Sequence, residues 1–282
     1  MNKPLLCALS SVLILGAGAA PAVAGPHHDR GHGKHHHSQD VDFSGTVALS
    51  NCSGSVVRMP DSQPTDPALV LSNGHCLESG MPGAGEVLTD QPSDRSFTLL
   101  DAAGKDLGTV QADKLAYATM TDTDVSLYQL TSTYQEIADQ YGIEPLNVSD
   151  QHPKESTAIS VVSGYWKKIY SCDVDAFVHE LKEGDWTFKD SVRYTSACDT
   201  IGGTSGSPVV DSATREVVAV NNTGNEDGEE CTMNNPCEVD ENGEVTVHQG
   251  INYAQQTYLI PACIGAGNKL DLEAEGCTLP KP

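Results

Sequence analysis

Basic residues are scarce in this sequence, and beyond residue 24 there is no long uncharged apolar run. The chain carries 16 Lys and Arg against 39 Asp and Glu, which gives a net charge of −23. Nucleic-acid binding needs a basic surface, and a transmembrane helix needs about 20 consecutive apolar residues. We therefore expect no nucleic-acid partner and no membrane partner, and we expect the protein to be a monomer.

The first 40 residues differ from the rest. Residues 1–24 carry one positive charge, then an apolar run, then small residues ending in Ala22-Val23-Ala24. This pattern predicts a secretory signal peptide that is cut after Ala24. Residues 25–40, GPHHDRGHGKHHHSQD, are rich in His and Gly and lack apolar periodicity, which predicts a flexible leader or pro-segment. We expect a secreted, extracellular protein.

Cysteine spacing argues against a zinc site, because none of the CxxC pairs typical of such sites is present. Cys7 leaves with the signal peptide, and the eight that remain are expected to form disulfides in an oxidising compartment. The simplest set joins neighbours in sequence: Cys52–Cys76, Cys172–Cys198, Cys231–Cys237 and Cys263–Cys277. We predict no metal and no cofactor.

Helical patterns are also few, one near residues 134–142 and one near 253–264. Most of the chain from residue 41 consists of short apolar runs, rich in β-branched residues and separated by turn residues. Examples are SGSVVRM, PALVLSNG, DVSLYQL, TAISVVSG and REVVAVN, with AAGKDLG and DSATRE as hairpin turns. This texture predicts an all-β sandwich or barrel pair rather than βαβ units.

Glycines crowd around one serine in residues 198–211, CDTIGGTSGSPVVD. A serine hydroxyl becomes a nucleophile only when a base takes its proton, and the oxyanion that forms must be stabilised. Gly202, Gly203 and Gly206 permit a tight turn whose backbone N–H groups could do this. We predict Ser205 as nucleophile and the N–H groups of Gly203 and Ser205 as the oxyanion hole. A plain glycine-rich turn is the alternative.

The base would be a histidine, and His75 is the best placed, after an apolar strand and beside Cys76 in ALVLSNGHCLES. The acid that orients it should lie at the edge of a strand and away from water. Asp124 in TDTDVSLYQL precedes such a strand, and Asp122 is the alternative acid.

The order His75, Asp124, Ser205, in the contexts SNGHC, TDVSLYQL and GGTSGSPVV, resembles the chymotrypsin-like (trypsin-fold) serine peptidases. The segment CDTIGGTSGSPVV most resembles the same segment of the bacterial secreted branch that includes the glutamyl endopeptidases. The resemblance implies two antiparallel six-stranded β-barrels over residues 41–262, with the triad in the cleft between them and a short C-terminal helix. Residues 263–282 would be a tail pinned by a disulfide.

The same resemblance implies a substrate pocket beside Asn221, Asn222, Thr223 and Gly224, with Asp199 where trypsin keeps an acid. Two features depart from the family. Thr204 stands where digestive members carry aspartate, and Asn221 or Asn222 stands where glutamate-specific members carry histidine. The acidic segment 225–244 could attract basic substrates, bind calcium or be a solvated loop.

We predict a secreted serine endopeptidase that hydrolyses peptide or protein substrates through an acyl-enzyme. Two alternatives belong to other classes. One is a catalytically inactive binding protein on the same fold, and the other is a secreted metal-binding protein that uses the His-rich leader. An α/β-hydrolase would need G-x-S-x-G and the order Ser, acid, His. Here glycine follows Ser205 immediately, and only His248 lies downstream of it in a strand-rich chain.

Overall fold

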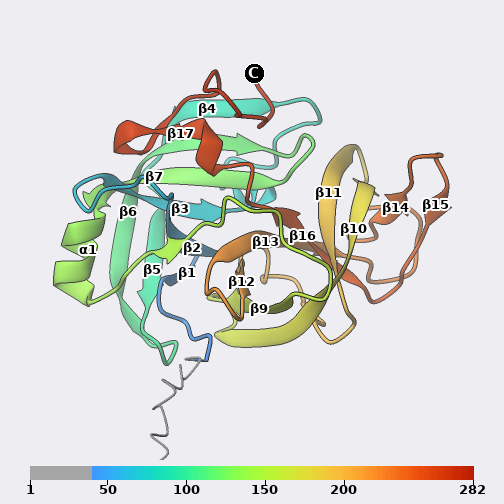
Figure 1. Ribbon diagram of the computed structural model, residues 1–282, viewed down its shortest axis with the longest axis horizontal. Coiled ribbons are helices and arrows are strands. Elements are labelled where there is room, and N and C mark those ends of the chain that lie inside the picture. Colours follow the sequence, from blue (N-terminus) through green and yellow to red (C-terminus); the bar gives the residue numbers. More distant parts are fainter. Residues whose placement is uncertain (1–39) are drawn as a thin grey trace, which may run out of the picture. The chain divides into compact units, whose positions relative to one another are not determined.

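Antiparallel strands make up almost all of the described chain, which is residues 40–282 of a computed structural model. Signal peptide and leader, predicted for residues 1–40, fall outside this range except for residue 40. Among the described residues, no helix is both long and apolar enough to span a membrane. Two barrels of strands lie side by side in Figure 1, the first blue to green and the second yellow to orange.

The first barrel is a closed ring of six strands. In order around the ring they are β1 (Thr46–Ala48), β5 (Ser96–Leu100), β6 (Asp106–Thr119), β7 (Val125–Thr133), β3 (Pro67–Ser72) and β2 (Ser53–Arg58), which pairs back with β1. Two further strands, β4 (Val87–Pro92) and β8 (Leu146–Asn147), pair with β6 and β2 from outside the ring. Alternate residues point inward, so the interior fills with aliphatic and aromatic side chains such as Val56, Val70 and Phe97.

The second barrel is a ring-like sheet of the same kind. Its order is β9 (Ala158–Ser163), β10 (Lys168–Glu183), β11 (Trp186–Tyr194), β16 (Asn252–Gln256), β13 (Val217–Gly224) and β12 (Pro208–Asp211), which pairs with β9. Two short strands, β14 (Cys237–Val239) and β15 (Val245–Thr246), extend the sheet beyond β10. The predicted all-β architecture of two barrels is confirmed.

One of the two predicted helices is present. The helix α1 (Tyr134–Tyr141) begins at a capping box, in which Thr133 and Glu136 each bond the other's backbone N–H, and ends at Gly142 with φ 67°. Both predicted hairpin turns also form, since Gly104 N–H donates to Asp101 and Arg215 N–H donates to Asp211.

The predicted C-terminal helix is wrong. The first residues of the predicted helix, 253–256, belong to the strand β16. The chain then turns through two short 3-10 helices, η2 (Pro261–Cys263) and η3 (Ala266–Asn268). Pro261 cannot donate a helical hydrogen bond, and Gly267 has φ 72°, so no α-helix can run on here. Between and after these turns, β17 (Ile264–Gly265) pairs with β18 (Lys269–Leu270).

The C-terminal residues pack on the first barrel instead, and β17 lies near β4 and β7 in Figure 1. Ile260 and Leu279 join a buried cluster with first-barrel residues, and Tyr117 donates its hydroxyl proton to the Pro280 carbonyl at 2.9 Å. All four disulfides predicted from sequence neighbours are formed: Cys52–Cys76, Cys172–Cys198, Cys231–Cys237 and Cys263–Cys277. Four disulfides indicate an extracytoplasmic compartment.

Candidate active site

His75 lies in η1 (Gly74–Cys76), the turn that follows β3. Asn73 opens this turn, and its buried side-chain amide donates to the Asp124 carbonyl at 2.8 Å. The Asn73 carbonyl accepts from the Ser126 hydroxyl at 2.8 Å, so the side chain and the backbone of this residue are both bound to the segment formed by Asp124 and the start of β7. A Cβ on Gly74 would lie 2.3 Å from the Thr119 carbonyl oxygen, and only glycine fits there.

Asp124 is fully buried, and each of its carboxylate oxygens forms a hydrogen bond with His75. His75 Nδ1 lies 2.6 Å from Oδ2, and the His75 backbone N–H donates to Oδ1 at 3.1 Å. The alternative acid, Asp122, faces elsewhere and pairs with Lys189 at 2.9 Å. Burial by itself lowers the pKa of His75, but the charge and hydrogen bond of Asp124 outweigh it and raise the pKa above 6.5.

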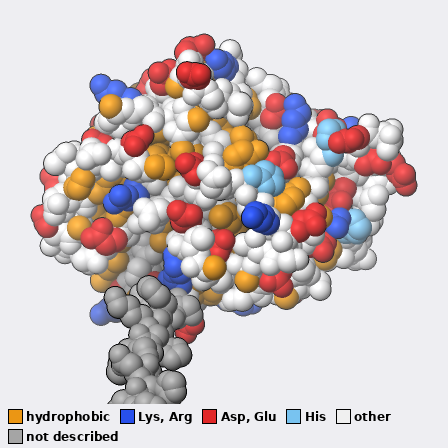
Figure 2. Space-filling model, viewed as in Figure 1, with side chains coloured by type: hydrophobic (Ala, Val, Ile, Leu, Met, Phe, Trp, Pro, Cys, Tyr) orange, Lys and Arg blue, Asp and Glu red, His pale blue; other side chains and the backbone are white. Residues whose placement is uncertain are grey.

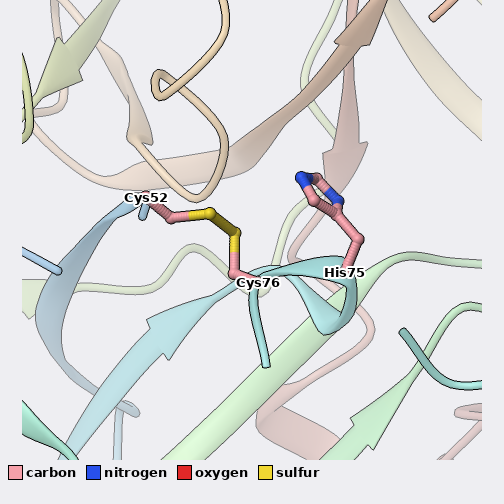
Figure 3. A group of neighbouring side chains, drawn as sticks. All are labelled: Cys52, His75 and Cys76. Carbon is pink, nitrogen blue, oxygen red and sulfur yellow. A yellow bond between two sulfur atoms is a disulfide. The ribbon is translucent and has the colours of Figure 1, made fainter. Parts of the chain in front are cut away.

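A disulfide fixes the turn from the other side. Cys76 follows His75 and is bonded to Cys52, as Figure 3 shows. The sulfurs lie near the imidazole, but they are bonded to each other and so cannot act as thiolate metal ligands. Buried Arg95 completes the support, because its guanidinium donates to the Cys76 carbonyl at 2.7 Å.

Ser205 lies in the loop that leads into β12, between two glycines at positive φ. Gly206 has φ 79°, and a Cβ there would lie 2.1 Å from the Ser53 carbonyl oxygen. The Ser205 carbonyl accepts from the Ser53 backbone N–H at 2.8 Å. The Ser205 hydroxyl donates to the Asn222 carbonyl at 3.3 Å, and within residues 40–282 it has no hydrogen bond to His75.

The carbonyls of Gly202 and Gly203 are both held by side chains of other segments. The Trp166 indole N–H donates to the Gly202 carbonyl at 2.7 Å, and the Ser53 hydroxyl donates to the Gly203 carbonyl at 3.3 Å. Because the C=O and N–H of a trans peptide point in opposite directions, the Gly203 N–H faces away from the indole. In the described part of the chain, the N–H groups of Gly203 and Ser205 have no acceptor.

His75, Asp124 and Ser205 line one cavity, which holds about 640 Å³ of empty space, part of it open to solvent. Four predicted pocket residues, Asn221, Asn222, Thr223 and Gly224, line it as well. Asp199 does not, since its side chain is exposed and outside the cavity wall. The remaining walls come from both barrels and from the acidic segment, through Met81, Met120, Glu183, Trp186, Thr200, Ile201, Gly202, Thr204, Glu226, Met233, Asn234 and Asn252.

The family profile described as "Trypsin-like peptidase domain" matches residues 52–220, more than half of the chain. The chain belongs to the trypsin-like peptidase family. Membership implies a serine hydrolase that acts on proteins or peptides. A comparison with curated proteins finds no match.

Solved structures similar to this trypsin-like peptidase are distant in sequence. The MamO protease domain from Magnetospirillum magneticum is 13% identical, with 77% of this chain and 94% of that chain covered and a TM-score of 0.48. The active form of the Rv3671c protease from M. tuberculosis is 14% identical, with 86% and 85% covered and a TM-score of 0.46. Protease Anisep from Arthrobacter nicotinovorans is 17% identical, with 77% and 90% covered and a TM-score of 0.45.

Sequence reasoning missed several residues of this trypsin-like peptidase's cavity, above all Glu183 and Trp186. They lie at the tip of the β10–β11 hairpin, and the chain gives no sign that this tip reaches His75. One signal was available. The chain has only two tryptophans, and both are at the site, Trp166 on the glycine loop and Trp186 in the cavity wall.

Proposed function

We propose that the protein is a secreted serine endopeptidase in which His75, Asp124 and Ser205 form the catalytic triad. The observation that carries this proposal is the 2.6 Å contact between His75 Nδ1 and Asp124 Oδ2, in a cavity that Ser205 also lines. A carboxylate at Nδ1 fixes the tautomer in which Nε2 is unprotonated. The imidazole is then ready to accept a proton from a hydroxyl.

In the proposed mechanism the Ser205 hydroxyl turns from the Asn222 carbonyl to His75 Nε2 when substrate binds. His75 takes the hydroxyl proton while Oγ attacks the peptide carbonyl, and the imidazolium then protonates the leaving amine. Water hydrolyses the resulting ester, with His75 again acting as base. Catalytic hydrogen bonds are often long or misaligned before substrate binds.

The oxyanion that forms on the substrate carbonyl would be bound by the N–H groups of Gly203 and Ser205. Both are free of other acceptors within the described residues, as an oxyanion hole requires. Trp166 donates to the Gly202 carbonyl, whose peptide carries the Gly203 N–H, and the Ser207 hydroxyl donates to the Thr204 carbonyl, whose peptide carries the Ser205 N–H. Trp166 and Ser207 would act as positioning residues.

A catalytically inactive binding protein on the same fold is the second candidate. It is favoured by one observation, the hydrogen bond from the Ser205 hydroxyl to Asn222 in place of one to His75. The third class, metal binding by the His-rich leader, concerns residues outside the described range and stays a prediction.

We do not propose glutamate specificity, although the sequence is similar to the branch that includes the glutamyl endopeptidases. Asn221 lies on the pocket strand, and both the oxygen and the nitrogen of its side-chain amide are hydrogen-bonded within the protein. Its Oδ1 accepts from Tyr194 at 3.1 Å, and its Nδ2 donates to Thr204 at 3.2 Å. A substrate carboxylate would find no free cation here, and burying it would be costly.

Single and double variants test the proposal. Residues of a triad act as a unit, so their effects on kcat are far from additive. We expect Ser205→Ala and His75→Ala each to lower peptide hydrolysis by about 10⁴-fold or more, and the double variant to lose little beyond either one. The catalytic roles are contradicted if the folded wild type hydrolyses no peptide of a broad library, or if the two losses multiply.

A further inference from the structure

We propose that Glu183 forms a subsite for a cationic side chain, lysine or arginine, of the peptide substrate. This inference rests on the proposed peptidase function and adds the substrate class to it. The position implied by the family resemblance, Asp199, is exposed and outside the cavity, so an acid there does not supply this specificity.

Glu183 is an acid buried in the wall of the active-site cavity. It ends β10, is 7% exposed and accepts the Asn234 backbone N–H on Oε1 at 2.8 Å. Thr223 acts on its carboxylate as well and lowers its pKa, though less than burial raises it. A carboxylate has about four acceptor positions, so these partners leave room for a further donor. Burial raises the free energy of the charged form, and this raises the pKa of the carboxyl.

The cavity offers no side chain that neutralises this charge. Of the described residues that line it, none is a lysine or an arginine. His75 attracts Glu183 only when the imidazole is protonated, and its Nδ1 is already bound to Asp124. Two further acids line the same space: Asp124, which is bound to His75, and Glu226, which adds to the negative potential. A cation that entered the cavity would therefore be attracted by these carboxylates and repelled by no permanent positive charge.

The walls around Glu183 suit the stem of a long basic side chain. Met81, Met120, Trp186 and Met233 present thioether and indole surfaces to the cavity. Lys and Arg bury their methylene stems along apolar surfaces and place the charge at a polar tip. Trp186 is held by a hydrogen bond from its Nε1 to the Pro82 carbonyl at 2.9 Å, so its ring is fixed in place.

A structural role for Glu183 is the competing explanation, because its carboxylate also holds the acidic segment against the hairpin through Asn234. Glu183→Gln separates the two roles. Glutamine keeps a carbonyl oxygen that can accept the Asn234 N–H but loses the charge. If Glu183 has only a structural role, the variant should keep the substrate preference of the wild type. If it forms a cation subsite, the variant should lose the preference for lysine.

The test compares matched peptides in which lysine or norleucine occupies each position around the cleaved bond in turn. Norleucine keeps the stem and lacks the charge. At the position that reaches Glu183, we expect wild-type kcat/KM to favour lysine by at least about tenfold, which is roughly 1.4 kcal/mol. Glu183→Gln should reduce that ratio by a similar factor. Glu241→Gln removes the same charge at an exposed site of the acidic segment and should leave the ratio unchanged.

Two results would overturn the inference: an active wild type with no preference for lysine at any position, or a preference that survives in Glu183→Gln. A wild type that hydrolyses nothing would instead defeat the proposed function. In that case calorimetric binding of the same peptide pairs to the folded protein decides the subsite. Tighter binding of the lysine peptide that vanishes in Glu183→Gln supports it, and equal binding refutes it.

Discussion

His75 and Asp124 are 49 residues apart in sequence, and three contacts lock them together. Two join His75 to the carboxylate, and the third joins Asn73 to the Asp124 backbone. The local motifs SNGHC and TDVSLYQL single out His75 and Asp124 as candidates, because each residue lies at the end of a predicted strand. Their convergence, however, depends on the pairing of β3 with β7, which is a property of the barrel.

The first prediction at this scale concerns pH. Only the unprotonated imidazole can accept a proton, so kcat/KM should rise with pH and reach half its maximum above pH 6.5, since Asp124 raises the pKa of His75. Asp124→Asn removes that charge, so the midpoint should move to lower pH, and kcat should fall by about 10⁴-fold. A pH–rate profile of both proteins measures this, and an unchanged midpoint in the variant would count against Asp124 as the partner.

A second prediction concerns the glycine that follows the nucleophile. Gly206 and Gly250 both have φ 79°, but a Cβ on Gly206 would strike the Ser53 carbonyl, whereas nothing lies within 4 Å at Gly250. Gly250→Ala should cost about 1 kcal/mol of unfolding free energy for its backbone conformation. Gly206→Ala should cost about 3 kcal/mol or more, because a collision with backbone is added. Denaturant unfolding of both variants compares the two costs, and equal values would refute the collision.

Asp199 and Glu183 show where residue-level prediction fails. Asp199 was placed by its distance in sequence from Ser205, but the loop turns its side chain to solvent. Glu183 follows a stretch of alternating polar and apolar residues and looks like a solvent-facing acid. Burial at a hairpin tip depends on which loops cover it, here the segment that carries Asn234, and that information is not local.

Among the elements, the β10–β11 hairpin and the β9–β10 turn shape the site most. The hairpin carries Glu183 and Trp186, and the turn carries Tyr165 and Trp166, whose rings meet edge to face at 5.0 Å. Short β-branched runs such as those of β9 and β13 were predicted correctly. The long strands β6, β10 and β11 were not, because their polar residues face solvent and interrupt the apolar runs. The prediction of a C-terminal helix was wrong because the spacing of apolar residues does not show that they pack on the surface of the first barrel.

The turn makes a prediction of its own. Trp166→Phe keeps an aromatic ring beside Gly203 but removes the N–H that holds the Gly202 carbonyl. Loss of a direct oxyanion donor costs about 10²–10³ in kcat, so loss of its support should lower kcat by about tenfold and leave KM nearly unchanged.

Tyr165→Phe is the matched control, since no hydrogen bond of the Tyr165 hydroxyl is present among the described residues, and it should keep full kcat. Steady-state kinetics of both variants separate kcat from KM. A Trp166→Phe enzyme with wild-type kcat, or with only KM changed, would show that the indole does not position the oxyanion hole.

The whole molecule is strongly acidic, with a net charge of −23. Figure 2 shows acidic side chains over much of one face, including the edge where β14 and β15 lie. Such a field attracts cationic substrates and weakens as salt shortens its range. Acidity thus reinforces the subsite proposed at Glu183.

A salt series tests this at the scale of the molecule. Between 0.02 and 0.5 M NaCl (~25-fold), kcat/KM for a lysine-rich peptide should fall about tenfold or more, because the Debye length shrinks to a few ångströms. A neutral peptide of the same length should change little. If both peptides respond equally, the charge of the protein does not steer its substrate.

The central claim is that Ser205 is an activated nucleophile, and fluorophosphonate labelling followed by peptide mapping tests it most directly. We predict one label per molecule on Ser205, no label on the folded Ser205→Ala variant and at least hundredfold slower labelling of His75→Ala. A folded wild-type protein that stays unlabelled, or that is labelled at another residue, would contradict the account.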